Sequence, residues 1–153
     1  MKLLLILLFV PFISFASEKS SCSELINDCE YYSCVSATKH CENSSYPMQF
    51  GRRFCLRYGK EIHKFSRQGR LWIVNVRKCL MNEMEKFEDG LSCNDLKVKA
   101  FKSHVACYVD HGFCELSLKD KQQVMTTIWP GLLSFLAIEN GLGVLNSCYT
   151  SKL

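Results

Sequence analysis

Apolar residues recur at steps of three and four along most of this chain, which is the period of an amphipathic α-helix. The clearest stripe lies in residues 48–66, where one face carries Phe54, Cys55, Tyr58, Ile62 and Phe65. Strand-like alternation of useful length is not found, and the sequence has no internal repeat. The pattern therefore predicts an all-α domain of about four to five helices.

Interruptions of this period predict where the helices of the N-terminal half begin and end. A short helix is expected over residues 23–33, followed by a loop over residues 35–49. The helix over residues 48–66 is expected to end at Gly69, in the left-handed position that glycine favours after a helix. A further helix is expected over residues 70–87.

Capping residues and breakers divide the C-terminal half in the same way. Ser92 or Asn94 is expected to cap a helix that runs to about residue 108, and Ser117 to open the last helical region. Pro130 must kink or restart that region, because proline cannot continue an undistorted helix. Gly141 and Gly143 are expected to stop it before Cys148.

Ten cysteines add a second constraint, and the N-terminus explains their number. Residues 1–16 combine Lys2, an apolar run and a small-residue cleavage site, which predicts a cleaved signal peptide and a mature domain over residues 17–153. No second long apolar run follows, so no transmembrane anchor is expected. In a secreted chain ten cysteines can form five disulfides. The predicted fold is therefore a disulfide-stapled helical domain located outside the cell.

Two surface features have candidate functions. The segment Asn43-Ser44-Ser45 is an N-glycosylation sequon, so Asn43 is predicted to carry a glycan. Opposite the apolar stripe of residues 48–66 lies a basic stripe, which could bind an anionic glycan or an acidic patch of an extracellular protein. The alternative for this stripe is a solvated helix face. It consists of Arg53, Arg57, Lys60, Lys64 and Arg67.

Other functional classes have little support. The formal net charge of +4 does not require a nucleic-acid partner. No cysteine and histidine spacing typical of zinc sites occurs, and no cofactor or metal is expected. The segment from Cys107 to Cys114 weakly resembles the active-site helix of secreted phospholipases A2, in which His111 would be the base. However, Asp110 precedes this histidine and the calcium loop is missing, so no enzyme is predicted.

One segment is similar to a known family. Residues Lys64-Phe65-Ser66-Arg67-Gln68-Gly69-Arg70, followed by Lys78-Cys79, resemble a segment of the stanniocalcins. Cys107-Tyr108 before Cys114, and the spacings Cys55 to Cys79, Cys93 to Cys107 and Cys114 to Cys148, also resemble that family. The resemblance covers residues 22–148.

The resemblance implies a disulfide pairing. Carried over by cysteine order, it gives Cys22–Cys34, Cys29–Cys55, Cys41–Cys93, Cys79–Cys107 and Cys114–Cys148. Bridged Cα atoms lie within about 7 Å, whereas one continuous helix would separate Cys22 from Cys34 by about 18 Å. The chain must therefore turn back between these two residues.

The resemblance also implies a function and partners. A stanniocalcin-like protein would be a secreted, hormone-like glycoprotein that regulates calcium and phosphate by binding a receptor or a secreted protease. A homodimer is possible, but the covalent dimer of that family uses a cysteine beyond the tenth, which this sequence lacks. The alternative is a secreted lipid-binding or effector-type helical scaffold, which a hydrophobic cavity would favour.

Overall fold

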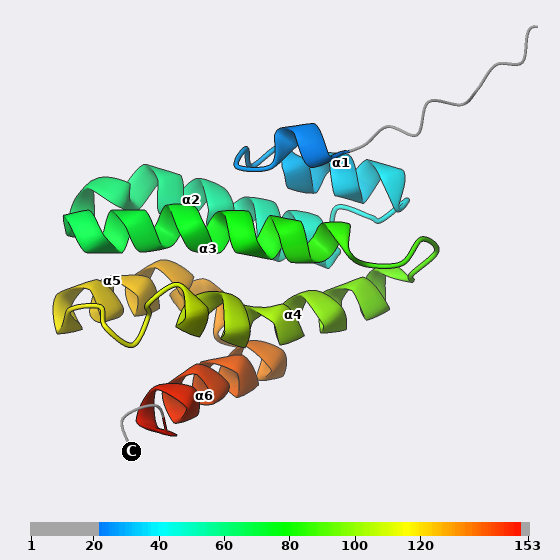
Figure 1. Cartoon of the computed structure of the whole chain (residues 1–153). Helices are drawn as coiled ribbons and strands as arrows, with labels where there is room; N and C mark the ends of the chain where they lie inside the picture. Colours follow the sequence, from blue (N-terminus) through cyan, green and yellow to red (C-terminus); the bar gives the residue numbers. More distant parts are fainter. Residues whose placement is uncertain (1–21, 151–153) are drawn as a thin grey trace, which may run out of the picture.

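A computed structural model describes residues 22–150, and six α-helices and four shorter helical turns make up most of this part of the chain (Figure 1). The all-α, disulfide-stapled fold is confirmed, while the predicted signal peptide lies outside the described residues. The elements are η1 (Cys22–Leu25), α1 (Tyr31–Thr38), η2 (Pro47–Arg52), α2 (Arg53–Glu61), η3 (Ile62–Lys64), α3 (Arg67–Glu85), α4 (Cys93–Asp110), α5 (Leu118–Ile128), η4 (Trp129–Gly131) and α6 (Phe135–Thr150).

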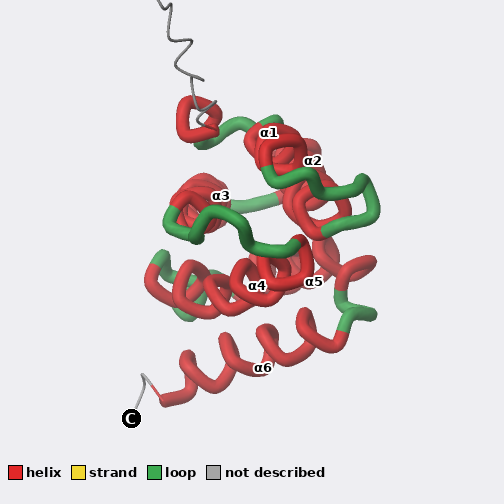
Figure 2. Tube along the Cα trace, turned by 90° about the vertical axis from the view of Figure 1, so that its right-hand side faces the viewer, coloured by secondary structure: helices red, strands yellow, loops and turns green. Residues whose placement is uncertain are grey.

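The helices form three layers. Figures 1 and 2 show α1, α2 and α3 on one side, α4 and α5 in the middle, and α6 on the far side of α4. Helix α4 packs against both α3 and α6, and α2 packs against α5. Because α6 has its main contacts with α4 alone, one of its faces is left open.

Three serines begin the long helices by the same local mechanism. Each hydroxyl accepts a hydrogen bond from the backbone N–H three residues later, at 3.1 Å in all three cases. Such a bond satisfies one of the free N–H groups of a first helical turn. The predicted caps at Ser92 and Ser117 are confirmed, with Ser92 chosen over Asn94. The third cap, Ser66, was not predicted.

The prediction that a helix ends at Gly69 is wrong. The chain becomes extended at Phe65, and α3 begins at Arg67, so Gly69 lies in its first turn. A Cβ atom at Gly69 would lie 2.7 Å from Oδ1 of Asp120 at the start of α5. Glycine is required here by this close approach and not by a left-handed backbone.

Asp120 is the reason for that close approach, because it connects the starts of α3 and α5. Its carboxylate accepts hydrogen bonds from the backbone N–H of Ser66 at 2.9 Å and from the hydroxyls of Ser66 and Ser117 at 2.6 and 2.9 Å. Burial alone would raise the pKa of Asp120, but these hydrogen bonds outweigh it and lower the pKa. The buried carboxylate therefore stays charged and fixes the two helices together.

Two further predictions of helix boundaries are wrong, and both concern α1. Residues 23–33 do not form one helix, because η1 ends at Leu25 and α1 begins only at Tyr31, with Asn27 at a positive φ of 86° in between. Likewise α1 extends to Thr38, into the predicted loop. The turn between η1 and α1 is what allows Cys22 to reach Cys34.

Helix α6 also differs from its prediction. It continues through Gly141 and Gly143 to Thr150 and is not stopped by them. A Cβ at Gly143 would lie 3.0 Å from a methyl of Val105, so glycine lets α6 approach α4. The predicted interruption at Pro130 is confirmed, since η4 and a short turn separate α5 from α6. This separation raises the helix number to six.

Five disulfides connect the layers, with Cα separations of 5.2–5.7 Å. They join the same pairs that the resemblance implies, and no described cysteine is free. One bridge clamps α3 to α4 and another ties the segment before α5 to α6. The bridges are Cys22–Cys34, Cys29–Cys55, Cys41–Cys93, Cys79–Cys107 and Cys114–Cys148.

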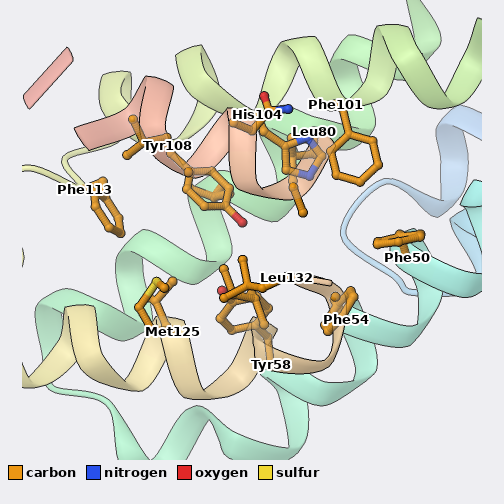
Figure 3. Close-up of a pocket in the computed structure, with 18 of the residues that line it drawn as sticks. Phe50, Phe54, Tyr58, Leu80, Phe101, His104, Tyr108, Phe113, Met125 and Leu132 are labelled. Atoms are coloured by element: carbon orange, nitrogen blue, oxygen red, sulfur yellow. The ribbon is translucent and has the colours of Figure 1, made fainter. Parts of the chain in front are cut away.

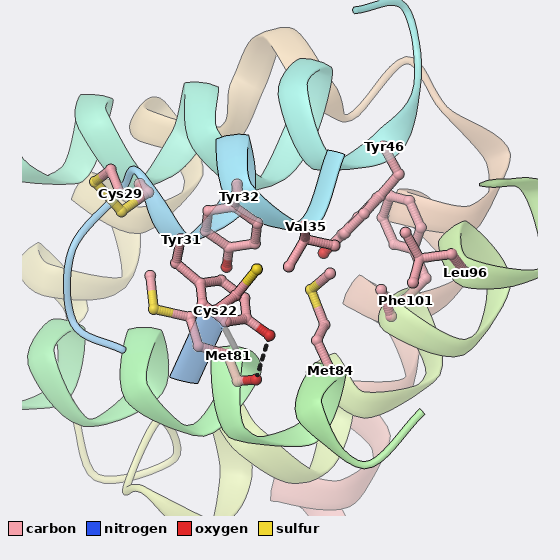
Figure 4. Close-up of a cluster of buried hydrophobic side chains, with 12 residues drawn as sticks. Cys22, Cys29, Tyr31, Tyr32, Val35, Tyr46, Met81, Met84, Leu96 and Phe101 are labelled. Carbon is pink, nitrogen blue, oxygen red and sulfur yellow. Dashed lines mark hydrogen bonds between the residues drawn. A yellow bond between two sulfur atoms is a disulfide. The ribbon is translucent and has the colours of Figure 1, made fainter. Parts of the chain in front are cut away.

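The buried side chains form two clusters. The first, which we call the α1 core, packs α1 on α3 and α4 (Figure 4) and includes Tyr31, Val35, Met81, Met84 and Leu96. The Tyr31 hydroxyl donates to the Met81 carbonyl at 3.0 Å and also pairs with Glu85 at 2.8 Å. The second, which we call the α5 core, packs α5 on α3 and includes Trp72, Ile73, Phe113, Val124 and Val144.

Candidate ligand-binding cavity

A cavity of about 490 Å³ lies where the two clusters meet, between α2, α3, α4, α5, η4 and α6. Its walls are almost entirely apolar and aromatic, and its size falls within the range of small-molecule sites. Figure 3 shows the residues that define its shape: Phe50, Phe54, Tyr58, Leu80, Phe101, His104, Tyr108, Phe113, Met125 and Leu132.

Two helices supply facing rows of rings. Phe50, Phe54 and Tyr58 follow each other at steps of four along η2 and α2, so they share one face. Phe101, His104 and Tyr108 follow at steps of three and four along α4 and form the opposite wall (Figure 3). At one end the rows meet, because the rings of Phe50 and Phe101 lie 5.3 Å apart at an angle of 75°.

Trp72 of α3 holds one wall of the cavity in place. Its ring packs edge-on against Tyr108 at 5.1 Å and lies 5.6 Å from Phe113 and 6.4 Å from Tyr58. Its indole N–H donates to the Tyr108 carbonyl at 3.2 Å. Because Trp72 is buried and its only donor is paired, this wall is preformed.

The cavity contains a few polar groups that are uncharged at neutral pH. Burial raises the pKa of Tyr58 well above its usual value and that of Tyr108 to about 12. Burial also lowers the pKa of His104, so its imidazole is neutral. The Tyr58 hydroxyl is buried and interacts with the Tyr108 hydroxyl, but it forms no hydrogen bond of ordinary length and angle with a described residue.

The cavity opens between the α5–η4 segment and α6. Its lining on this side consists of large apolar side chains that are also exposed to solvent, with Leu133 at 89 % and Trp129 at 67 %. An exposed apolar surface of this kind usually marks a binding site. We call it the apolar rim, and it consists of Met125, Trp129, Leu133, Ile138, Leu142 and Leu145.

The five predicted basic residues do not form one uncompensated face. The helix breaks at Phe65, so Arg67 lies on α3, apart from the other four. Glu61 pairs with Lys64 at 3.5 Å and with Arg57 at 3.8 Å. Arg57 also donates to the Thr126 carbonyl at 3.2 Å.

The remaining basic residues, Arg53, Lys60 and Arg67, are exposed, as the predicted stripe requires. Arg53 lies over the ring of Phe54, with its guanidinium carbon 5.7 Å from the ring centroid, and remains exposed. The surface that could attract an anion is therefore smaller than the predicted stripe and comes from two separate helices.

The other candidate residues lie at the surface and in turns. Asn43 is exposed in the loop between α1 and η2, and only its backbone carbonyl is engaged, by the Gln49 amide at 2.9 Å. The sequon is therefore accessible. His40 lies in a turn at a φ of 52°, and His111 follows α4 with its Nδ1 3.0 Å from the Cys107 carbonyl. No three or more described His, Cys, Asp or Glu residues are grouped so that they could hold a metal ion.

Some of the cavity residues could be found in the sequence. Phe54 and Tyr58 were predicted to lie on the apolar face of their helix, and both line the cavity. Phe50 and His104 were missed, although steps of four from Phe54 and Tyr108 lead directly to both. A ring at every fourth position on two helices is the signal that could have found them.

Comparisons of the chain with protein-family models, with curated proteins and with solved structures found no match. Within residues 22–150, none of the helices has both the length and the apolar character that a membrane span requires.

Proposed function

We propose that this protein is an extracellular carrier that binds an apolar small molecule in the cavity between its helical layers. The observation that carries the proposal is the cavity itself, which is large, aromatic and open on one apolar side. Five disulfides fit an extracellular protein and would keep the walls apart in the absence of a ligand.

The packing explains why the cavity would persist. Protein interiors are normally filled to the density of organic crystals, and voids in them are destabilising. Here Cys79–Cys107 fixes α3 to α4, Cys114–Cys148 fixes α6 to the segment before α5, and Cys29–Cys55 fixes the α2 wall, since Cys55 lines the cavity. Trp72 further stiffens the wall between them. A rigid wall cannot collapse onto the void. An apolar ligand can therefore bury its own surface against apolar walls that no protein side chain covers.

The apolar rim gives such a ligand a way in. Since Met125, Trp129 and Leu133 are exposed and yet line the cavity, an apolar molecule can contact them before it is enclosed. Helix α6 contributes the other side of this entrance and is held mainly by α4. Small movements of α6 would widen the entrance, although Leu136 and Ala137 at its start also pack against the α1 core.

Fluorescence with Nile red, an uncharged dye that brightens in apolar surroundings, tests the proposal. The native protein should bind the dye, and organic extraction of secreted protein should release a bound lipid. Leu80→Trp should fill the cavity and reduce dye binding at least several-fold, whereas Leu71→Trp should leave it unchanged, because Leu71 is exposed on α3 away from the cavity. If the native protein neither binds the dye nor releases a lipid, the proposal is wrong.

A second candidate is the hormone-like function implied by the resemblance to stanniocalcins. It is supported by the disulfides, which join the pairs that the resemblance implies. The protein would then bind a receptor, a secreted protease or an anionic glycan, and the exposed residues Arg53, Lys60 and Arg67 would take part. Glycosylation at the accessible Asn43 belongs to the same candidate.

Charge reversal tests this second candidate. The triple variant Arg53→Glu, Lys60→Glu, Arg67→Glu should elute from heparin at lower salt than a control with three reversals elsewhere. The control changes three lysines that are also exposed and lie outside this set: Lys78, Lys102 and Lys119. Equal elution of both variants would show that the basic residues only solvate their helices.

A further inference from the structure

Tyr58 carries a polar group that the fold uses only weakly. The residue is 7 % exposed and lines the cavity, and its hydroxyl interacts with the neighbouring Tyr108 hydroxyl but forms no hydrogen bond of ordinary length and angle with a described residue. Most buried hydroxyls are hydrogen-bonded, and leaving one unpaired is destabilising. A hydroxyl without such a bond in a ligand-sized cavity is therefore a candidate contact for a polar group of the ligand.

The opposite wall offers complementary groups. His104 has its Nδ1 2.7 Å from the Ala100 carbonyl, and because a carbonyl can only accept, Nδ1 must carry the proton. Its Nε2 is then a bare acceptor, since the ring is neutral. Figure 3 shows the side chains of His104 and Tyr108 extending from α4 into the cavity, across from Tyr58.

We propose that Tyr58, His104 and Tyr108 bind the hydroxyl group of an otherwise apolar ligand, such as a long-chain alcohol or a sterol. This inference rests on the proposed carrier function and specifies its ligand. A hydroxyl both donates and accepts, so it can donate to Nε2 of His104 and accept from a tyrosine. A carboxylate can only accept, and it would bring a charge into an apolar space.

Arg77 is the one charged side chain in the lining, and it defines the competing ligand class. Its Nη2 donates to the Asn27 carbonyl at 3.0 Å and lies 3.3 Å from Sγ of Cys29, which holds the guanidinium on the α1 side. Its Nε is buried and has no partner. A fatty acid would use this group, whereas an alcohol would use Tyr58 and His104.

Displacement of Nile red by three ligands of equal chain length separates these cases. Tetradecanol should displace the dye at about a tenfold lower concentration than tetradecane, because it adds one or two hydrogen bonds. Tyr58→Phe should reduce this ratio about three- to tenfold. Tyr149→Phe makes the same chemical change on the exposed face of α6, outside the cavity, and should leave the ratio unchanged.

The outcomes distinguish this inference from the carrier function. If the dye binds but tetradecanol and tetradecane displace it equally, or if Tyr58→Phe leaves their ratio intact, the hydroxyl site is refuted and the carrier function stands. If tetradecanoate displaces the dye best and Arg77→Met removes that preference, the ligand is a fatty acid and the inference is overturned. If the native protein neither binds the dye nor releases a lipid on extraction, the carrier function itself fails. Circular dichroism of each variant verifies that it folds.

Discussion

The α1 core and the cavity are built from the same kinds of side chain, but they differ in how completely the space is filled and in how their polar groups are hydrogen-bonded. In the α1 core, Tyr31 and Met81 are completely buried, and the Tyr31 hydroxyl is paired with a carbonyl and a carboxylate. In the cavity, Tyr58 is nearly as buried, but its hydroxyl interacts with Tyr108 without a hydrogen bond of ordinary geometry, and the space beside it is not filled. The comparison teaches that burial alone does not distinguish a structural core from a binding site, whereas filled volume and paired polar groups do.

The disulfides follow the same division only in part. Three of the five bridges, including Cys41–Cys93, enclose η1, α1 and their connections to α2 and α4. The other two, Cys79–Cys107 and Cys114–Cys148, join α3 to α4 and the segment before α5 to α6. Cys29–Cys55 belongs to both regions, because Cys55 also lines the cavity. We infer that the first group stabilises the packed core and that Cys29–Cys55 also fixes the α2 wall of the cavity.

Removal of Cys41–Cys93 should have the largest effect on stability. This bridge has the longest sequence separation, 52 residues, against 12 for Cys22–Cys34. A longer closed loop restricts the unfolded chain more, so Cys41→Ser/Cys93→Ser should cost about 4 kcal/mol and Cys22→Ser/Cys34→Ser about 3 kcal/mol. Denaturant unfolding of the two double variants measures the difference, and equal midpoints would contradict the loop-length argument.

Truncation of one leucine in each region tests the comparison directly. Leu96 is 1 % exposed in the α1 core, so Leu96→Ala should leave a cavity and cost about 3 kcal/mol. Leu132 already borders the open cavity and is partly exposed, so Leu132→Ala should cost under about 1 kcal/mol. Thermal melting of both variants checks this. Equal losses would mean that the walls of the cavity are packed as tightly as the core.

The sequence predicted what local signals determine. Ser92 and Ser117 cap helices because a serine hydroxyl reaches a backbone N–H three residues ahead, which requires no distant partner. Gly69 was misread because its role depends on Asp120, which lies far away in the sequence. Gly143 was misread for the same reason, through its contact with Val105.

The cavity could not be predicted in this way. Helical periodicity shows that Tyr58 and Phe101 face inward, but it does not show whether the facing residues touch or leave a space between them. That outcome depends on how far apart the bridges and Trp72 hold the helices. The environment of the Tyr58 hydroxyl is likewise a tertiary property, since Tyr108, with which it interacts, lies on another helix.

Asp120 should make the cavity region sensitive to acid. Its pKa in the folded protein is lowered, so its stabilising contribution is complete above the unfolded value of about 3.9 and is lost as the pH falls through the folded pKa. Asp120→Asn should cost roughly 2 kcal/mol at neutral pH and flatten the acid limb of the stability curve. Unfolding of both proteins from pH 7 to pH 2 measures this. Parallel acid limbs would show that other carboxylates cause the acid sensitivity.

Removal of one tyrosine hydroxyl from the α1 core and one from the cavity should give the smallest and most selective effects on stability. Tyr31→Phe removes a hydroxyl that pairs with the Met81 carbonyl and the Glu85 carboxylate, so it should cost about 1 kcal/mol. Tyr58→Phe removes a hydroxyl that interacts with Tyr108 without a hydrogen bond of ordinary geometry, so it should change stability by much less than Tyr31→Phe does. Both changes delete the same atom from a buried tyrosine, so the difference between the two melting temperatures reports only on how that hydroxyl is used. A loss of stability in Tyr58→Phe as large as in Tyr31→Phe would mean that the Tyr58 hydroxyl serves the fold and is not reserved for a ligand.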